Sequence, residues 1–248
     1  MGSKILAIFV MILSLPLVAL RVELSNDTFS TTGRAANRNL FVTNNSEKMI
    51  ALEVYAQSRE IDPNSGVDLL EDVEDFLIYP NQLLLQPDEQ QVVTLTWVGP
   101  QSITDELAFR IIVEELNLSL GEDGLEDEEM TVKLAALTKV IKAAYVAPGK
   151  AKANVTVLKS EVIAGDDQDK KIKITLNNTG TAHKILKQTN IEVVALNAEG
   201  NKIKESAIRF IPNELQGVLN ILAKSQRVIT IDWPEGMSND ISNVHVSL

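Results

Sequence analysis

Residues 91–98, QVVTLTWV, alternate polar and apolar side chains and stop at Gly99-Pro100. Alternation with a period of two is typical of a strand with one buried face. Gly-Pro is a strong turn signal, so we expect the strand to end there. Trp97 falls on the apolar face and is interpreted as a core residue. The segment therefore predicts a half-buried strand followed by a tight turn.

Runs of the same kind recur along the chain, with turn residues between them. In the first half they are residues 39–43, 50–55, 91–98 and 108–115, and in the second half residues 154–158, 171–176, 191–196 and 227–233. Short strands separated by turns are typical of antiparallel sandwiches, and no long segment with helical periodicity competes. Residues 199–201 (EGN) indicate a hairpin turn, and residues 214–224 fit either one or two helical turns or an irregular strand.

The 248-residue length allows two sandwiches. Residues 145–150 (YVAPGK) interrupt a strand pattern with Pro148 and Gly149, and a new alternating pattern begins at Asn154. We place the hinge between the domains in this segment. The predicted organisation is a targeting segment over residues 1–19, a first domain over 20–146 and a second over 147–248.

The first nineteen residues are interpreted as a signal peptide. Lys4 precedes an uncharged apolar run over residues 5–20, which is shorter than a bilayer span requires. Ala19 is a small residue at the expected cleavage position. Because the site is not a clean A-x-A, an uncleaved N-terminal anchor remains the alternative. In the signal-peptide interpretation the mature protein is exported.

Composition excludes several classes of function. The chain has 23 basic and 34 acidic residues, a net charge of −11, which argues against binding to nucleic acid. It has no cysteine and only two histidines, His183 and His245, so most zinc sites and histidine-based triads are excluded. Residues 121–129 hold six carboxylates and are interpreted as an exposed loop. Calcium is the alternative there, but the spacing does not match an EF-hand. We expect no metal, cofactor or small-molecule substrate.

Several segments, in this order, resemble the PapD-like periplasmic chaperones of the chaperone–usher pathway of pilus assembly, with most likeness to its divergent, archaic branch. They are residues 76–80 (FLIYP), 85–87 (LQP), 91–97, 109–116 (FRIIVEEL), 137–139 (LTK), 145–148 (YVAP) and 176–183 (LNNTGTAH). Two features depart from the family. The chain is acidic, and Thr28 stands where the best-studied members carry an anchoring arginine.

The resemblance implies an all-β protein of two immunoglobulin-like sandwiches in a boomerang arrangement, located in the periplasm. It implies a chaperone that binds and stabilises pilus or fimbrial subunits by donor-strand complementation and delivers them to an outer-membrane usher. Met130, Val132 and Leu134 share one face of an extended segment, and the resemblance makes them the donor strand. An ordinary half-buried strand has the same alternation.

The family also holds the C-terminal carboxylate of the subunit between two basic side chains, because a partly buried carboxylate needs charge-assisted hydrogen bonds. The resemblance assigns this anchoring role to Arg110 and Lys139. Lys142 fits less well by parity and spacing, but the choice between Lys139 and Lys142 stays open. Three arginines are fallback candidates: Arg21, Arg34 and Arg38.

Two other classes of function remain as alternatives. A structural or adhesive component of a surface appendage would have the same two sandwiches. An enzyme would need a carboxylate pair such as Glu114 and Glu115, or Asp166 and Asp167. Adjacent residues of a strand point to opposite faces, and residues 166–169 are interpreted as a hairpin loop. We therefore expect no catalytic residues.

Overall fold

The computed structural model describes residues 19–117, 137–165 and 169–248, and in these residues nearly all regular structure is β-strand. The strands of the first domain are β1 (Leu20–Leu24), β2 (Thr28–Ser30), β3 (Asn37–Asn44), β4 (Ile50–Ile61), β5 (Asp68–Asp72), β6 (Phe76–Tyr79), β7 (Gln82–Leu85), β8 (Gln90–Trp97), β9 (Leu107–Glu115) and β10 (Lys139–Ala147). A 3₁₀ turn, η1 (Arg34–Ala36), precedes β3.

The first domain is a sandwich of two sheets. One has the order β1-β3-β8-β6, and the other has the order β2-β10-β9-β4-β5, with β7 also paired to β4. All of these pairs are antiparallel except β10 with β2. The chain passes from the first sheet to the second between β1 and β2. This two-layer arrangement is the immunoglobulin-like sandwich that the sequence predicts.

The core of this domain is aromatic at one end. The rings of Phe29, Phe76, Trp97 and Phe109 contact one another with centroids 5.1–5.5 Å apart, mostly edge to face. Leu40, Val42, Val93 and Leu95 continue the core toward the other end and are fully buried. Trp97 is 5% exposed, so the core position predicted from its alternation is confirmed.

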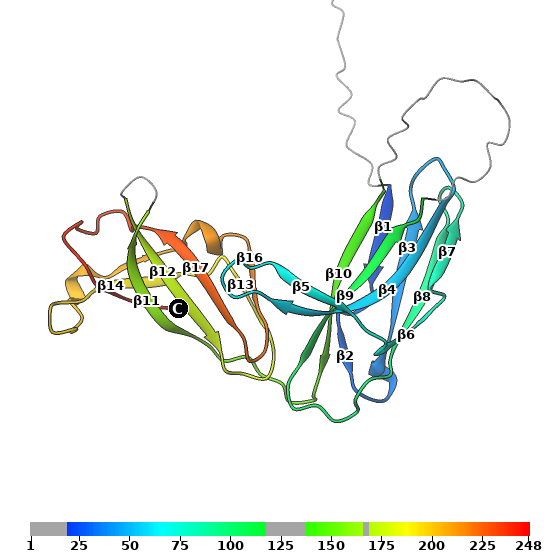
Figure 1. Ribbon diagram of the computed structural model, residues 1–248, viewed down its shortest axis with the longest axis horizontal. Helices are drawn as coiled ribbons and strands as arrows, with labels where there is room; N and C mark the ends of the chain where they lie inside the picture. Colours follow the sequence, from blue (N-terminus) through cyan, green and yellow to red (C-terminus); the bar gives the residue numbers. More distant parts are fainter. Residues whose placement is uncertain (1–18, 118–136, 166–168) are drawn as a thin grey trace, which may run out of the picture.

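The second domain is built from three smaller sheets around a separate core. Their orders are β11-β12-β17, β13-β16 and β15-β14-β18. The strands are β11 (Val155–Ala164), β12 (Lys170–Asn178), β13 (Lys184–Lys187), β14 (Ile191–Ala195), β15 (Ile208–Phe210), β16 (Val218–Ile221), β17 (Gln226–Asp232) and β18 (Val244–Ser247), with 3₁₀ turns η2 (Lys204–Ser206) and η3 (Asn213–Leu215). Figure 1 shows the two domains meeting at an angle.

Each domain ends a central strand on a buried asparagine. Asn44 closes β3 and Asn178 closes β12, and both side chains are fully buried. The Nδ2 of Asn44 donates to the carbonyls of Lys48, Leu85 and Gln86. The Nδ2 of Asn178 donates to those of Ala182, Ile221 and Leu222. Each amide thus satisfies carbonyls of a strand end and of neighbouring loops that would otherwise lack a donor.

The connection between the domains begins later than the sequence predicts. Residues 145–147 continue β10 and are largely buried, so the irregular segment runs from Pro148 to Asn154. Gly180 lies against this segment, where a Cβ would be only 2.3 Å from the carbonyl oxygen of Lys152. The expected domain limits of 20–146 and 147–248 stay a prediction.

Two further local expectations can be compared with the structure. The turn at residues 199–201 is confirmed. Gly200 has a φ of +81°, and the Asn197 N–H donates to the Asn201 carbonyl across the turn. Residues 214–224 combine part of a 3₁₀ turn with strand β16. Among the described residues, no helix has the length and apolar character needed to cross a membrane.

Candidate functional site: an open strand edge and the groove beside it

Within the described residues, strand β10 has an edge that is unpaired over most of its length. On one side it pairs with β9 from Lys139 to Val146, and on the other side its pairing with described residues is limited to residues 145–147, which pair with β2. Glu115 N–H donates to the Thr138 carbonyl, whereas Tyr145 N–H donates to the Asp27 carbonyl on the opposite side. Hydrogen-bonding direction alternates along a strand, so the backbone groups of Lys139, Ile141 and Ala143 face the open edge.

Strand β1 presents a second open edge in the facing sheet. It is the outermost strand of its sheet and pairs only with β3 within the described residues. Asn45 N–H donates to the Ala19 carbonyl and Ser25 N–H to the Asn39 carbonyl, so the odd-numbered residues of β1 face β3. The backbone groups of Leu20, Val22 and Leu24 therefore point outward. Among residues 19–117, 137–165 and 169–248, no strand therefore covers this flank of the sandwich on either sheet.

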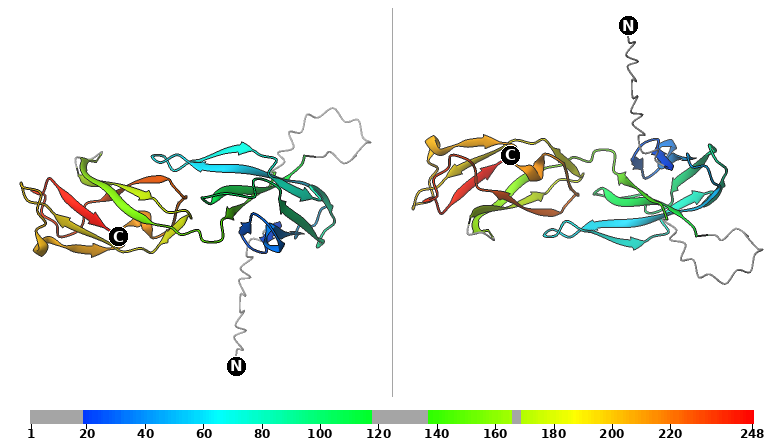
Figure 2. Two further views of the ribbon diagram at one scale, coloured as in Figure 1. Left: turned by 90° about the horizontal axis from the view of Figure 1, so that it is seen from below. Right: turned by 90° about the horizontal axis from the view of Figure 1, so that it is seen from above.

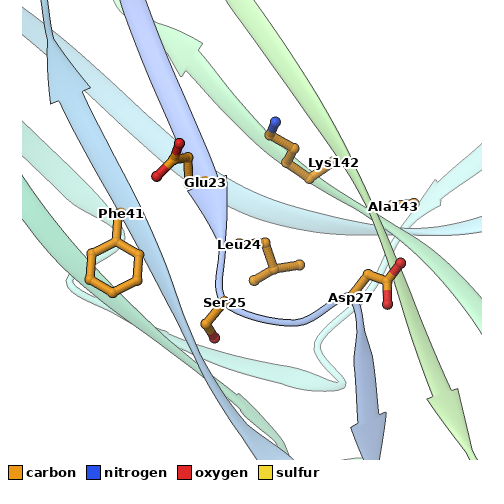
Figure 3. Close-up of a pocket in the computed structure, with 7 residues that line it drawn as sticks. All are labelled: Glu23, Leu24, Ser25, Asp27, Phe41, Lys142 and Ala143. Carbon is orange, nitrogen blue, oxygen red and sulfur yellow. The ribbon is translucent and has the colours of Figure 1, made fainter.

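A groove of about 570 Å³ lies where these two edges converge. Figure 3 shows its lining: Glu23, Leu24 and Ser25 from the end of β1, Asp27 from the crossing to β2, Phe41 from β3, and Lys142 and Ala143 from β10. Leu24 lies at the centre of this ring of residues, with the charged side chains of Glu23, Asp27 and Lys142 around it. The groove thus combines an apolar surface with charges of both signs.

Lys142 is the cation of this groove. It has no hydrogen bond or ion pair within the part of the chain that the structure describes, whereas Glu23 is paired with Arg21. An ammonium group without an acidic partner is available to an incoming carboxylate. Lys142 is on the same face of β10 as the core residues Ala144 and Val146. Because the described strands leave the sandwich open at this edge, the Lys142 side chain reaches solvent.

Lys139 lies on the outer face of the same strand and already has partners. Its Nζ is 2.9 Å from the Tyr55 hydroxyl and 3.2 Å from Glu114 Oε2, and the hydroxyl donates to that same Oε2 at 2.6 Å. The hydrogen bonds from Tyr55 and Lys139 lower the pKa of Glu114, and those to Tyr55 and Glu114 raise the pKa of Lys139. Both groups are therefore charged at neutral pH and neutralise each other.

Arg110 is also engaged. Its Nε and Nη2 donate to Asp68 Oδ2 at 2.8 and 2.5 Å, while Arg59 Nε donates to Asp68 Oδ1 at 2.9 Å. Burial would raise the pKa of Asp68, but the hydrogen bonds from Arg110 and Arg59 outweigh it and lower that pKa. The carboxylate stays ionised between two guanidinium groups.

The structure places Arg110 and Lys139 on one face but does not bring them together. Lys139 is opposite Glu114 in the register, and Arg110 is opposite Ala143. Four residues along a strand separate them, roughly 13 Å at about 3.3 Å per residue. Each side chain instead contacts a carboxylate of its own, Glu114 for Lys139 and Asp68 for Arg110.

Other predicted site residues fall elsewhere. Met130, Val132 and Leu134 lie outside the described residues, as do the acidic segment 121–129, residues 1–18 and the pair Asp166 and Asp167. Glu114 bonds to Tyr55 and Lys139, whereas Glu115 accepts a hydrogen bond from the Thr138 amide. The described residues contain no group of three or more acidic or histidine side chains placed to hold a metal ion.

His183 contributes to the interface between the domains. Its ring Nδ1 is 2.6 Å from Glu106 Oε1, and its backbone N–H donates to the same oxygen. Its ring stacks on the Tyr145 ring, with the two ring centroids 3.8 Å apart. The Tyr145 hydroxyl accepts from Asn220 Nδ2. His183 therefore takes part in contacts between the two domains. Sequence spacing gives no signal for them, since residues 106 and 183 are in different domains.

Comparisons with known proteins give a structural likeness and no sequence match. No family model matches the chain, and no curated protein matches it. Among solved structures, the chain resembles the chaperone YadV (12% identity, 92% of this chain and 90% of that one, TM-score 0.51) and the class 5 fimbriae chaperone CfaA (11%, 92% and 99%, 0.50). It also resembles a chain of the CsuC–CsuE chaperone–tip subunit complex from archaic chaperone–usher Csu pili of Acinetobacter baumannii (10%, 91% and 96%, 0.52).

These structures span nine tenths of this chain, and the likeness therefore includes both domains and the connection between them. The two-domain, immunoglobulin-like fold of pilus chaperones is the fold of this protein. The fold predicted from the sequence is confirmed.

Proposed function

We propose that this protein is a periplasmic chaperone that binds pilus or fimbrial subunits and passes them to an outer-membrane usher. The observation that carries the proposal is the edge of β10 that no other described strand covers, beside the groove that contains Lys142. The shared fold with pilus chaperones supports the same conclusion. Chemically, the site offers backbone hydrogen bonds, an apolar surface and a free cation, and the proposal assigns no catalytic residue.

The open edge explains how a partner would bind. A strand at the edge of a sheet presents a row of unpaired N–H and C=O groups, which is a template for an extended segment of another chain. Donor-strand complementation between chaperone and pilin is an established example of such strand addition. We propose that Met130, Val132 and Leu134, which precede β10 in the chain, supply the apolar side chains that enter the partner. A partner strand would then continue along Lys139, Ile141 and Ala143.

The C-terminal carboxylate of the partner requires a cation, and the chain offers two places for it. Arg110 and Lys139 keep the anchoring role that the resemblance implies, but each would have to leave an acidic partner first. Lys142 has no partner to leave among the described residues and lies in the groove itself. We therefore favour Lys142 as the main anchor, with Lys139 as the alternative.

The experiment is co-purification of the tagged protein from the periplasm of its native host, followed by mass spectrometry. The expected partner is a small subunit that co-purifies in stoichiometric amount. Deleting the C-terminal residues of this subunit should abolish the complex. Val132→Asp should abolish capture, whereas Lys133→Gln, on the other face, should leave it intact. A protein that is exported and folded but forms its own polymer would overturn the proposal in favour of an adhesive appendage component.

The anchor is tested with matched lysine variants. Lys142→Gln should weaken subunit binding by about 2 kcal/mol, roughly thirtyfold in Kd, because a charge-assisted hydrogen bond is lost. Lys202→Gln, on the exposed surface of the second domain, removes the same charge and should have no effect. If Lys139→Gln weakens binding and Lys142→Gln does not, the anchor is Lys139.

A further inference from the structure

Among the described residues, the two domains contact each other around the connecting segment and also at a turn of the first domain. The first is next to the connecting segment, where His183 meets Glu106 and Tyr145. The second is at the turn between β4 and β5, which reaches the second domain at β17. Figure 2 shows the β4–β5 hairpin extending from its own sheet toward the second domain. A joint held at one place can rotate about it, whereas a joint held at two places is fixed in angle.

The second contact is made by backbone groups of the turn. Val228 N–H donates to the Pro63 carbonyl at 2.7 Å, and Arg227 Nη1 donates to the Asp62 carbonyl at 3.2 Å. Gly66 lies flat against the same guanidinium group, and a Cβ at this position would be 2.4 Å from Arg227 Nη2. A side chain at this position would displace the guanidinium group, and the φ of +76° independently favours glycine.

The turn is stiff because its own hydrogen bonds are satisfied. Asp62 Oδ1 accepts from the amides of Asn64 and Ser65 and from the Ser65 hydroxyl. Gly66 N–H donates to the Asp62 carbonyl, and Asp62 N–H to the Val67 carbonyl. Directly after the turn, Asp68 pairs with Ile61 and joins β5 to Arg59 of β4 and Arg110 of β9. A turn that is closed by its own hydrogen bonds and held by ion pairs beside it can transmit force to the domain it touches.

Arg227 is also held in an unusual environment. Its Nε is buried without a hydrogen-bond partner in the described part of the chain. Burial, followed by the nearby charge of Arg59, lowers the pKa of Arg227, and the charges of Asp68 and Asp62 partly oppose this. A cation is thus kept in a partly desolvated position by the geometry of the contact, and not by an ion pair.

We propose that the β4–β5 turn is a brace that locks the angle between the two domains through Gly66 and Arg227. With the brace in place, the contact at His183 and the contact at Arg227 make one rigid body of both domains. When the brace is released, the second domain rotates about the connecting segment. This inference does not depend on the proposed function, because it concerns the free protein.

The chain has no cysteine, which makes a distance measurement simple. Cysteines introduced at Thr94 and Glu199, both exposed and in different domains, carry spin labels for pulsed electron paramagnetic resonance. The spin-labelled protein that carries these two cysteines and no further substitution should give one narrow distance distribution. Gly66→Val should broaden or shift it, because the added side chain displaces Arg227.

Gly33 provides a matched control. It has nearly the same φ, +75°, but nothing lies within 4 Å of its hypothetical Cβ. Gly33→Val should therefore cause comparable backbone strain and leave the distance distribution narrow. Equal broadening in both glycine variants would overturn the proposal, as would an unchanged distribution in Gly66→Val.

Arg227→Ala tests the same contact without backbone strain, should Gly66→Val fail to fold. It should broaden the distribution, whereas Arg209→Ala, at an exposed arginine paired with Glu192 in the second domain, should not. A narrow, unshifted distribution in Arg227→Ala would also contradict the brace.

Discussion

At the scale of single residues, the buried asparagines Asn44 and Asn178 have the same structural role in the two domains. Each ends a central strand and donates to three carbonyl oxygens, one at the end of a neighbouring strand and two in loops. The sequence shows both as Asn-Asn pairs that suggest turns, but it does not show which carbonyls they bind. That information depends on strand ends about forty residues away, at Leu85 and Ile221, which only the folded chain brings close.

Replacement of Asn178 by alanine should destabilise the protein by about 3 kcal/mol, because buried carbonyls lose their donor. The measurement is urea-induced unfolding followed by circular dichroism. Asn177→Ala is the matched control, since this neighbour has no side-chain hydrogen bond among the described residues, and its effect should be within about 0.5 kcal/mol. A loss at Asn178 no larger than at Asn177 would contradict this role.

Asp68 predicts how stability responds to acid. Its pKa is lower in the folded than in the unfolded protein, so ionised Asp68 stabilises the fold. That contribution is fully present above the unfolded pKa of about 3.9 and is lost as pH falls through the folded pKa. In Asp68→Asn, urea midpoints measured between pH 7 and pH 3 should fall less steeply than in the unmodified protein. Parallel curves would show that Asp68 does not contribute.

At the scale of strands, prediction succeeds where a strand is long and has one buried face. Strands β3, β4, β8, β9, β12 and β17 all show alternation in the sequence, and the structure confirms them, although β4 continues six residues beyond the predicted 50–55. Short strands such as β2, β13 and β15 have three or four residues, too few for a period to be recognised. Strand β5 (DLLED) is not predicted, because its three charged residues leave too few apolar positions for an alternation to be recognised. Charged side chains are nevertheless common in a strand at the edge of a sheet.

The candidate site shows the same limit. Lys139 and Arg110 are conspicuous in the sequence, but their acidic partners Glu114 and Asp68 come into contact only through strand pairing. Lys142 fits the core parity of β10, and a lysine there indicates an opening in the sandwich. That signal was available in the sequence. The open edge itself was not, because it depends on where β1 crosses to β2.

The edge predicts a position-dependent effect of proline in β10. Ile141→Pro removes an N–H that faces the open edge and no bond of the β9 ladder, so the protein should fold with a loss of about 1 kcal/mol or less and bind its partner poorly. Val140→Pro removes a ladder bond and should cost about 3 kcal/mol or more. Thermal unfolding and the co-purification assay separate the two. Equal loss of stability in both variants would contradict the assigned hydrogen-bond directions.

At the scale of the whole molecule, charge is distributed unevenly between the halves. Residues 1–149 contain 10 basic and 23 acidic residues, whereas residues 150–248 contain 13 and 11. The acidic half carries the groove, and association with a basic partner would therefore be accelerated at low salt.

The two halves are joined by the contacts at His183 and Arg227, so we expect heat to unfold them in one cooperative transition. Calorimetry that resolves two transitions in the unmodified protein would contradict this coupling.

The central claim is that the free edge of β10 receives a strand from a partner. Amide hydrogen exchange, resolved by residue and measured with and without the purified subunit, tests it most directly. We predict that the amides of Ile141 and Ala143 exchange quickly in the free protein and become protected in the complex, while those of Val140 and Lys142 are protected in both. Unchanged exchange at Ile141 and Ala143 in a saturated complex would show that the partner binds elsewhere.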